Sequence, residues 1–138
     1  MSAEWNQEDL LYRQVHPSHA PHGVPSSQAF NPTPKDACKL SVDDSRVVTA
    51  EESWNHFTSN LGFQSCGTWA VSFDEIVSPV GLSLCLDPVE NPENAMLNNP
   101  AHCLIDFSGL ASKGERKKRA QQLAIHAAAR GIQFQPTS

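Results

Sequence analysis

Strand-like alternation of apolar and polar side chains recurs along this sequence, and only two helical stretches interrupt it. The alternation covers residues 67–73, 82–86 and 102–107, with shorter candidates at 10–15, 39–42 and 132–135. Strands that cluster in sequence with few helices between them favour an α+β fold over a doubly wound parallel sheet. We therefore expect a mixed, mainly antiparallel sheet, two main helices packed on it, and a long ordered loop near the N-terminus.

Both predicted helices begin with the same local signal. Thr49 with Glu52, and Ser112 with Glu115, form capping boxes, in which a hydroxyl and a carboxylate each accept a hydrogen bond from a backbone N–H group at the helix start. The first helix is predicted over residues 50–61, before the glycine at 62. The second follows Ser112 and ends at the glycine at 131, and its stripe of small apolar side chains suits close packing on a sheet.

The length of 138 residues suits one domain, which we expect over residues 10–138 after a flexible tail at 1–9. The first residues lack the basic start and apolar run of a secretory signal. No apolar stretch approaches the ~18 residues needed to cross a bilayer. The four cysteines lie far apart without a CxxC pair, so we interpret them as reduced, mostly buried thiols, with Cys85 and Cys103 as small hydrophobes. A cytoplasmic protein is the expected result.

The net charge of -5 is unevenly distributed. The predicted last helix, residues 113–130, has six of the ten basic residues and one glutamate, so it carries +5 and the remainder carries -10. This balance excludes a uniformly basic nucleic-acid face, although the basic start of the helix could still contact a phosphate or an acidic partner. The simpler interpretation is that these charges keep an alanine-rich helix soluble.

The segment 12–43 is the most polar part of the chain and is too rich in proline and glycine for regular structure. A long ordered loop loaded with donors and acceptors is more often a binding site than a spacer, because packing or a ligand has to offset its backbone entropy. The prolines at 32 and 34 stiffen it, which favours a preorganised binding loop. The predicted ligand-binding residues are Arg13, His16, Ser26, Ser27, Gln28, Phe30, Thr33, Lys35 and Asp36.

Three of the candidate side chains have simpler interpretations as well. The guanidinium of Arg13 suits a phosphate or carboxylate, but it could instead anchor the long loop by bonding its carbonyls. His16, His19 and His22 recur every third residue, yet the prolines between them exclude a helix, so no metal site is predicted. Glu75 could reach a loop site from a strand end, although a residue of the first turn of a helix is the favoured interpretation.

Motifs of known enzymes are absent from the sequence. No general base lies beside Ser26 or Ser27, so nucleophilic catalysis by these serines has no local support. The chain contains no GxSxG, no phosphate-binding glycine-rich loop and no HExxH. No catalytic role follows from motifs alone.

The segment LYRQVHP, residues 11–17, resembles the opening of small bacterial proteins of unassigned function. The stretches SSQAFNPTPKD, LSVD, TAEE and AHCLIDFSGL are similar to motifs of the same proteins. This resemblance spans most of the chain and implies no particular activity.

The same seven residues also resemble the start of the RES family, which comprises NAD-degrading toxins with an ADP-ribosyltransferase-like fold. That resemblance implies that Arg13 binds an NAD phosphate and that Glu75 is its acidic partner. The chain departs from the family in lacking the glycine-rich segment with Arg-Trp that follows and in offering no counterpart of the family's serine.

Three functional hypotheses follow. In the leading one, the loop from Arg13 to Asp36 binds a protein partner or a small anionic ligand, in an accessory or regulatory component that needs no cofactor. The alternative is an NAD-consuming enzyme of the ADP-ribosyltransferase kind, acting as a toxin or a component of a defence system, with Arg13 and His16 on the dinucleotide and Glu75 activating the ribose. In the third, the basic start of the last helix contacts nucleic acid.

Overall fold

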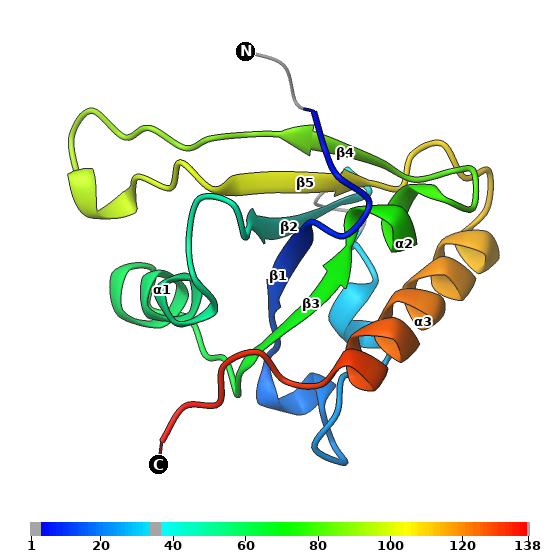
Figure 1. Ribbon diagram of the computed structural model, residues 1–138, viewed down its shortest axis with the longest axis horizontal. Coiled ribbons are helices and arrows are strands. Elements are labelled where there is room, and N and C mark those ends of the chain that lie inside the picture. The colour runs from blue at the N-terminus through cyan, green and yellow to red at the C-terminus, as the bar shows by residue number, and fades with distance from the viewer. Residues whose placement is uncertain (1–3, 34–36, 138) are drawn as a thin grey trace.

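The fold is α+β, built on an antiparallel sheet. The structure is a computed structural model that describes residues 4–33 and 37–137. In that part of the chain five strands pair in the order β3-β1-β2-β5-β4, and every pairing is antiparallel (Figure 1). The strands are β1 (Leu10–Gln14), β2 (Lys39–Asp44), β3 (Thr68–Ser72), β4 (Ser83–Leu86) and β5 (His102–Asp106). The predicted fold class is confirmed.

The two main helices lie on opposite faces of the sheet (Figure 1). The first is α1 (Ala50–Asn55), which continues as a π-helix over His56–Asn60, and the second is α3 (Lys113–Arg130). A short helix, α2 (Phe73–Val77), follows β3 directly. Both predicted long helices are confirmed, including the positive φ of 76° at Gly62 and of 94° at Gly131 after their ends.

The caps explain where these helices begin. Thr49 accepts from the N–H of Glu52 at 3.1 Å, and the Glu52 carboxylate accepts from the N–H of Thr49 at 2.8 Å. At α3 only half of the predicted box forms: Ser112 accepts from the N–H of Glu115, while its own hydroxyl donates to the Glu115 carboxylate at 3.1 Å. Each cap satisfies a donor that the first helical turn leaves unpaired.

The core lies between α3 and one face of the sheet. Alternate residues of β2 and β5, such as Leu40 and Ile105, point to this face and are buried, and their neighbours point to the α1 face. On α3 the predicted small-residue stripe is buried against them, with Leu123 at its centre. The 3₁₀ helix Ser27–Phe30 packs beside α3 and inserts the fully buried Phe30. The early polar loop is therefore fixed to the core at this point.

Two strand predictions are wrong, one over its whole length and one at its last residue. Residues 132–135 form no strand and make a single bridge between Phe134 and Thr68. Phe73, predicted as the last residue of a strand, begins α2, because Ser72 and Glu75 form a capping box there. Both segments have alternating apolar residues. A helix cap ends the strand before Phe73, and residues 132–135 lie beside β3 over too short a length to form a strand.

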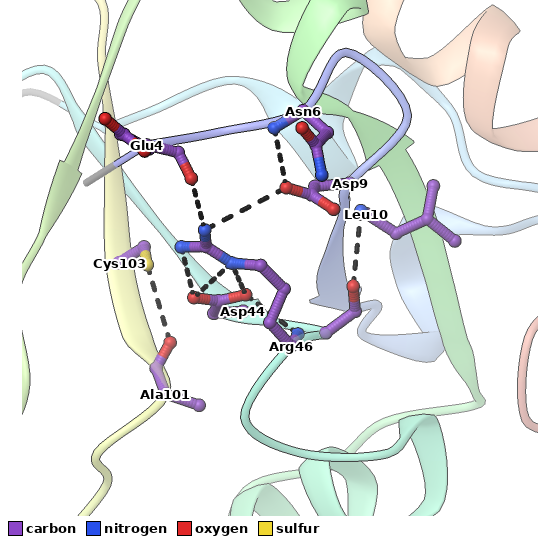
Figure 2. Close-up of polar contacts among 9 residues, drawn as sticks. Glu4, Asn6, Asp9, Leu10, Asp44, Arg46, Ala101 and Cys103 are labelled. Atoms are coloured by element: carbon purple, nitrogen blue, oxygen red, sulfur yellow. Dashed lines mark hydrogen bonds and ion pairs between the residues drawn. The ribbon is translucent and has the colours of Figure 1, made fainter. Parts of the chain in front are cut away.

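An arginine ties the first described residues to the sheet. Figure 2 shows Arg46 between the N-terminal segment and β2, donating to the carboxylate of Asp44 at 2.9 Å and to the carbonyl of Glu4 at 2.7 Å. Its guanidinium also lies 3.6 Å from the ring centre of Trp5, which stacks on Phe73 at 5.7 Å. Within the predicted tail 1–9, the residues from 4 onward thus lie against the fold.

Long apolar helices are the signature of membrane-spanning segments. Among the described residues, no helix is both long enough and apolar enough to span a bilayer.

Candidate functional site

Arg13 lies where β1 parts from β2. β1 pairs with β3 over its whole length, but with β2 only at Leu11 and Tyr12. Just beyond this point, the Arg13 side chain donates from Nε to the carbonyl of Ala29 at 2.8 Å and from Nη1 to the carbonyl of Ser41 at 3.0 Å. Arg13 therefore bonds the long loop to the sheet, as the anchoring interpretation requires.

The same arginine lines a hollow of about 580 Å³ between the early loop, β2 and the start of α3. We call this the basic hollow. Its lining residues are Arg13, His19, Gln28, Asn31, Pro32, Thr33, Cys38, Leu40, Lys113 and Arg116. Three of these side chains carry a positive charge, and no acidic side chain of the described segments lines it.

The local field of the basic hollow favours anions. Lys113 is the first residue of α3, so the positive end of that helix dipole lies at the rim. Burial, with the nearby charges of His16 and Arg13, lowers the pKa of His19, so this imidazole is neutral at pH 7 and can donate or accept a hydrogen bond. The hollow thus combines fixed positive charge with neutral donors.

Three predicted ligand-binding residues meet in the basic hollow, namely Arg13, Gln28 and Thr33. Ser26 and Ser27 are half-buried in the same loop but do not line the hollow, and the buried Ser26 hydroxyl has no partner among the described residues. Lys35 and Asp36 lie outside the described residues. The structure therefore brings only some of the predicted ligand-binding residues together.

Two other predicted site residues lie elsewhere. Phe30 is a core residue with no exposed surface, because the 3₁₀ helix turns its ring toward α3 and away from solvent. His16 is exposed and does not line the hollow; its Nδ1 lies 2.8 Å from the Ser18 hydroxyl and accepts from the Ser18 N–H at 3.1 Å. Its neighbour His19 takes the position in the hollow that we predicted for His16.

Glu75 lies past the opposite end of β3 from the residue that pairs with Arg13, and the two share no hollow in the described structure. Its carboxylate receives two hydrogen bonds from Arg130, at 2.8 and 3.0 Å, and one from the N–H of Ser72. The favoured interpretation, a residue in the first turn of a helix, is confirmed. An active site joining Arg13 to Glu75 gains no geometric support.

Acidification tests this role of Glu75. Burial alone would raise the pKa of Glu75, but the hydrogen bonds from Arg130 and Ser72 and the charges of Arg130 and His126 outweigh it and lower the pKa below its ordinary value of 4.5. The resulting stability is present above pH 4.5 and lost as the pH falls through the folded pKa. We expect Glu75→Gln to lower the free energy of unfolding by about 1 kcal/mol at pH 7, and by less at pH 3.

Urea unfolding at both pH values measures this effect. The exposed Glu93, changed to Gln, is the control, and it should match the parent at both. A deficit of Glu75→Gln that persists unchanged at pH 3 would contradict the proposed charge pairing.

Part of the basic run on α3 is structural. Arg119 is buried and donates to the carbonyl of Ile76 at 2.7 Å, and Arg130 holds Glu75. Lys117 and Lys118 are exposed to solvent. The basic residues of α3 were predicted to form a solvated face. In the structure some of them make hydrogen bonds within the protein, some line the basic hollow, and some are exposed to solvent.

The cysteines match the prediction in being reduced but not in their burial. All four, which lie in the described part of the chain, are free thiols, but only Cys103 is buried and Cys85 is exposed on the edge strand β4. Burial, together with the charges of Asp44 and Asp43, raises the pKa of Cys103 to about 12, so it is no nucleophile at neutral pH. No group of three or more metal-ligating side chains gathers within residues 4–33 and 37–137.

Comparison with family models, curated proteins and solved structures gives no match. The site therefore has to be interpreted from its own geometry. Lys113 and Arg116 were missed as partners of the loop because they lie about a hundred residues from Arg13 in sequence. The sequence shows that these two residues are basic. Their position beside the early polar loop follows only from the packing of the 3₁₀ helix Ser27–Phe30 on α3.

Proposed function

We propose that the protein binds a small anionic ligand in the basic hollow and acts as an accessory or regulatory component. The observation that carries the proposal is the meeting of Arg13, Lys113 and Arg116 around one opening of about 580 Å³. That volume lies within the range of small-molecule sites, which bury most of a ligand of nucleotide size.

Phosphate-bearing compounds are the ligand class that this lining fits best. Guanidinium groups bind phosphate oxygens through paired charge-assisted hydrogen bonds, and a helix start adds N–H groups and a positive field. Gln28, Asn31 and Thr33 supply neutral hydrogen-bonding groups that could orient the rest of the ligand. Arg13 is held by the carbonyls of Ala29 and Ser41, which preorganises it.

The test compares two charge-matched double variants. Isothermal titration with pyrophosphate, ADP and NAD measures binding to the parent, to Lys113→Gln/Arg116→Gln and to Lys117→Gln/Lys118→Gln. Both pairs remove two positive charges from α3, but only the first pair lines the basic hollow. We expect the first pair to weaken binding at least tenfold, about 1.4 kcal/mol, and the second to change it less than threefold.

Three results would count against the proposal. Equal weakening by both pairs would indicate a diffuse surface attraction, which is the behaviour expected for nucleic-acid contact by the helix start. No heat with any probe would remove anion binding altogether. Release of nicotinamide from NAD would favour the NAD-consuming enzyme instead.

A further inference from the structure

Three neighbouring strands bring a serine, a histidine and an aspartate together on the α1 face of the sheet. β2 and β5 pair with Asp43 opposite His102 and Ser41 opposite Leu104, so Ser41 and His102 are diagonal neighbours on that face. Asp87 follows β4, which pairs with the other edge of β5, and its N–H donates to the carbonyl of His102 at 2.9 Å. Strand register therefore determines how these three residues meet.

Their contacts form a continuous chain. His102 Nε2 lies 3.0 Å from the Ser41 hydroxyl oxygen. On the other side of the ring, Nδ1 lies 2.9 Å from the Asp87 carbonyl oxygen and 3.1 Å from a carboxylate oxygen of the same residue. Each of these links is within hydrogen-bond distance.

The contacts also define the tautomer of His102. Both oxygens of Asp87 can only accept, so Nδ1 has to carry the hydrogen. In the neutral imidazole, Nε2 is then the unprotonated nitrogen, and it can accept the hydroxyl hydrogen of Ser41. This is the arrangement of a general base aligned on a nucleophile and oriented by a carboxylate.

Exposure differs among the three residues. Ser41 is exposed, so a substrate can reach its hydroxyl, the His102 side chain is only 17% exposed, and the Asp87 side chain is 51% exposed. The nearby Asp43 does not compete for the imidazole. Its two carboxylate oxygens accept from Ser53 at 2.7 Å and from Asn99 at 2.9 Å.

Ser41 and His102 line a cavity of about 160 Å³ on this face. Phe57, Leu61 and Phe63, at and after the π-helix, form its apolar wall. Tyr12 lines it as well, and burial raises the pKa of this phenol, so the group stays a hydrogen-bond donor at neutral pH. The cavity is smaller than the 300–1,000 Å³ typical of drug-sized ligands, which limits the substrate to a short apolar group.

We propose that Ser41, His102 and Asp87 form a second site, which hydrolyses esters of short apolar carboxylic acids. The Ser41 oxygen attacks the ester carbonyl carbon while its proton passes to His102 Nε2. The carbon–oxygen bond to the alcohol then breaks, and the alcohol leaves with that proton. Water, losing a proton to His102, attacks the acyl-serine carbonyl carbon. The bond from this carbon to the Ser41 oxygen then breaks, His102 returns the proton to that oxygen, and the carboxylic acid is released.

Each partner has a defined part in these steps. The Asp87 carboxylate stabilises the imidazolium that forms on His102, and we assign the Tyr12 phenol, one of the donors that line the cavity, to the developing oxyanion. This site faces α1, whereas the basic hollow lies on the α3 side. Arg13 lines both cavities, but Lys113 and Arg116 line only the basic hollow, so variants of these two residues test the hollow alone.

Covalent labelling is the first test. A fluorophosphonate probe should modify Ser41, located by mass spectrometry of the digested protein. Ser18 is the internal control, because it is also exposed and also contacts a histidine, but through the Nδ1 that already accepts the Ser18 N–H. Labelling at Ser41 and not at Ser18 supports the site, whereas absence of label on Ser41 would overturn it.

Hydrolysis of p-nitrophenyl acetate is the second test. We expect Ser41→Ala and His102→Gln each to lower kcat/KM at least a hundredfold. Ser83→Ala, an exposed serine of the same sheet, and Lys113→Gln/Arg116→Gln should leave the rate unchanged. Equal rates in the parent and Ser41→Ala would show that the Ser41–His102 hydrogen bond only links β2 to β5 and has no catalytic role.

Discussion

Phe30→Ala should lower the free energy of unfolding by about 3 to 5 kcal/mol, the cost of removing a fully buried aromatic ring. Phe30 has no exposed surface and lies in the core cluster, although it belongs to the polar loop. A chain of this length is stabilised by roughly 7 to 20 kcal/mol in total, so the loss is a large fraction. Urea unfolding followed by tryptophan fluorescence measures it.

The matched control is Phe63→Ala. Phe63 is 57% exposed and its ring contacts that of Phe57, so its loss should cost about 1 kcal/mol or less. A conservative change, Phe30→Leu, should cost less than about 1.5 kcal/mol because most of the volume is kept. If Phe30→Ala and Phe63→Ala were equally mild, the early loop would not be part of the core.

The same change bears on the proposed ligand site. Ala29, next to Phe30, provides the carbonyl that holds Arg13 Nε. Loosening the 3₁₀ helix therefore releases an arginine of the basic hollow as well as core contacts. If the basic hollow binds an anion as we propose, ligand binding and stability are coupled through this one turn.

The sequence predicted the parts of the fold that depend on local patterns. Alternation located β2 and β5, and a capping box located the start of α1, because burial of one face and pairing of the first N–H groups act over a few residues. The same alternation wrongly predicted a strand at 132–135, where the segment after α3 pairs with β3 through one bridge only. The pattern of apolar residues does not show over how many residues two segments can pair.

The sites could be predicted only in part, because they depend on register and packing. The sequence predicted that Arg13 and Gln28 would lie together. Choosing His19 rather than His16 as the histidine of the basic hollow would have required knowing which way the 3₁₀ turn at 17–19 faces. Ser41, His102 and Asp87 belong to no catalytic motif that the sequence analysis identified. They meet because β2, β5 and β4 pair in one register, and a shift of one residue would turn Ser41 to the core face.

Arg46→Met should cost about 2 to 3 kcal/mol, somewhat less than the 3 to 5 kcal/mol for breaking a fully buried ion pair. The Asp44 side chain is 3% exposed and would be left charged without its partner, whereas Arg46 itself is 34% exposed, so water replaces it in part. The contact with the Trp5 ring and the bond to the carbonyl of Glu4 are lost as well. Lys118→Met, at an exposed position of α3, is the control and should change stability by less than about 0.5 kcal/mol.

The decisive comparison is the double variant Asp44→Asn/Arg46→Met. An asparagine keeps an oxygen that can accept from the N–H of residue 46, as Asp44 does at 2.8 Å, but it carries no charge. If the cost of Arg46→Met comes from a stranded carboxylate, the double variant should recover about 1 to 2 kcal/mol relative to the single one. If it is no more stable than Arg46→Met, the cost comes from the lost contacts to Trp5 and Glu4, and the arginine acts as a clamp on the N-terminal segment rather than as the counter-ion of Asp44.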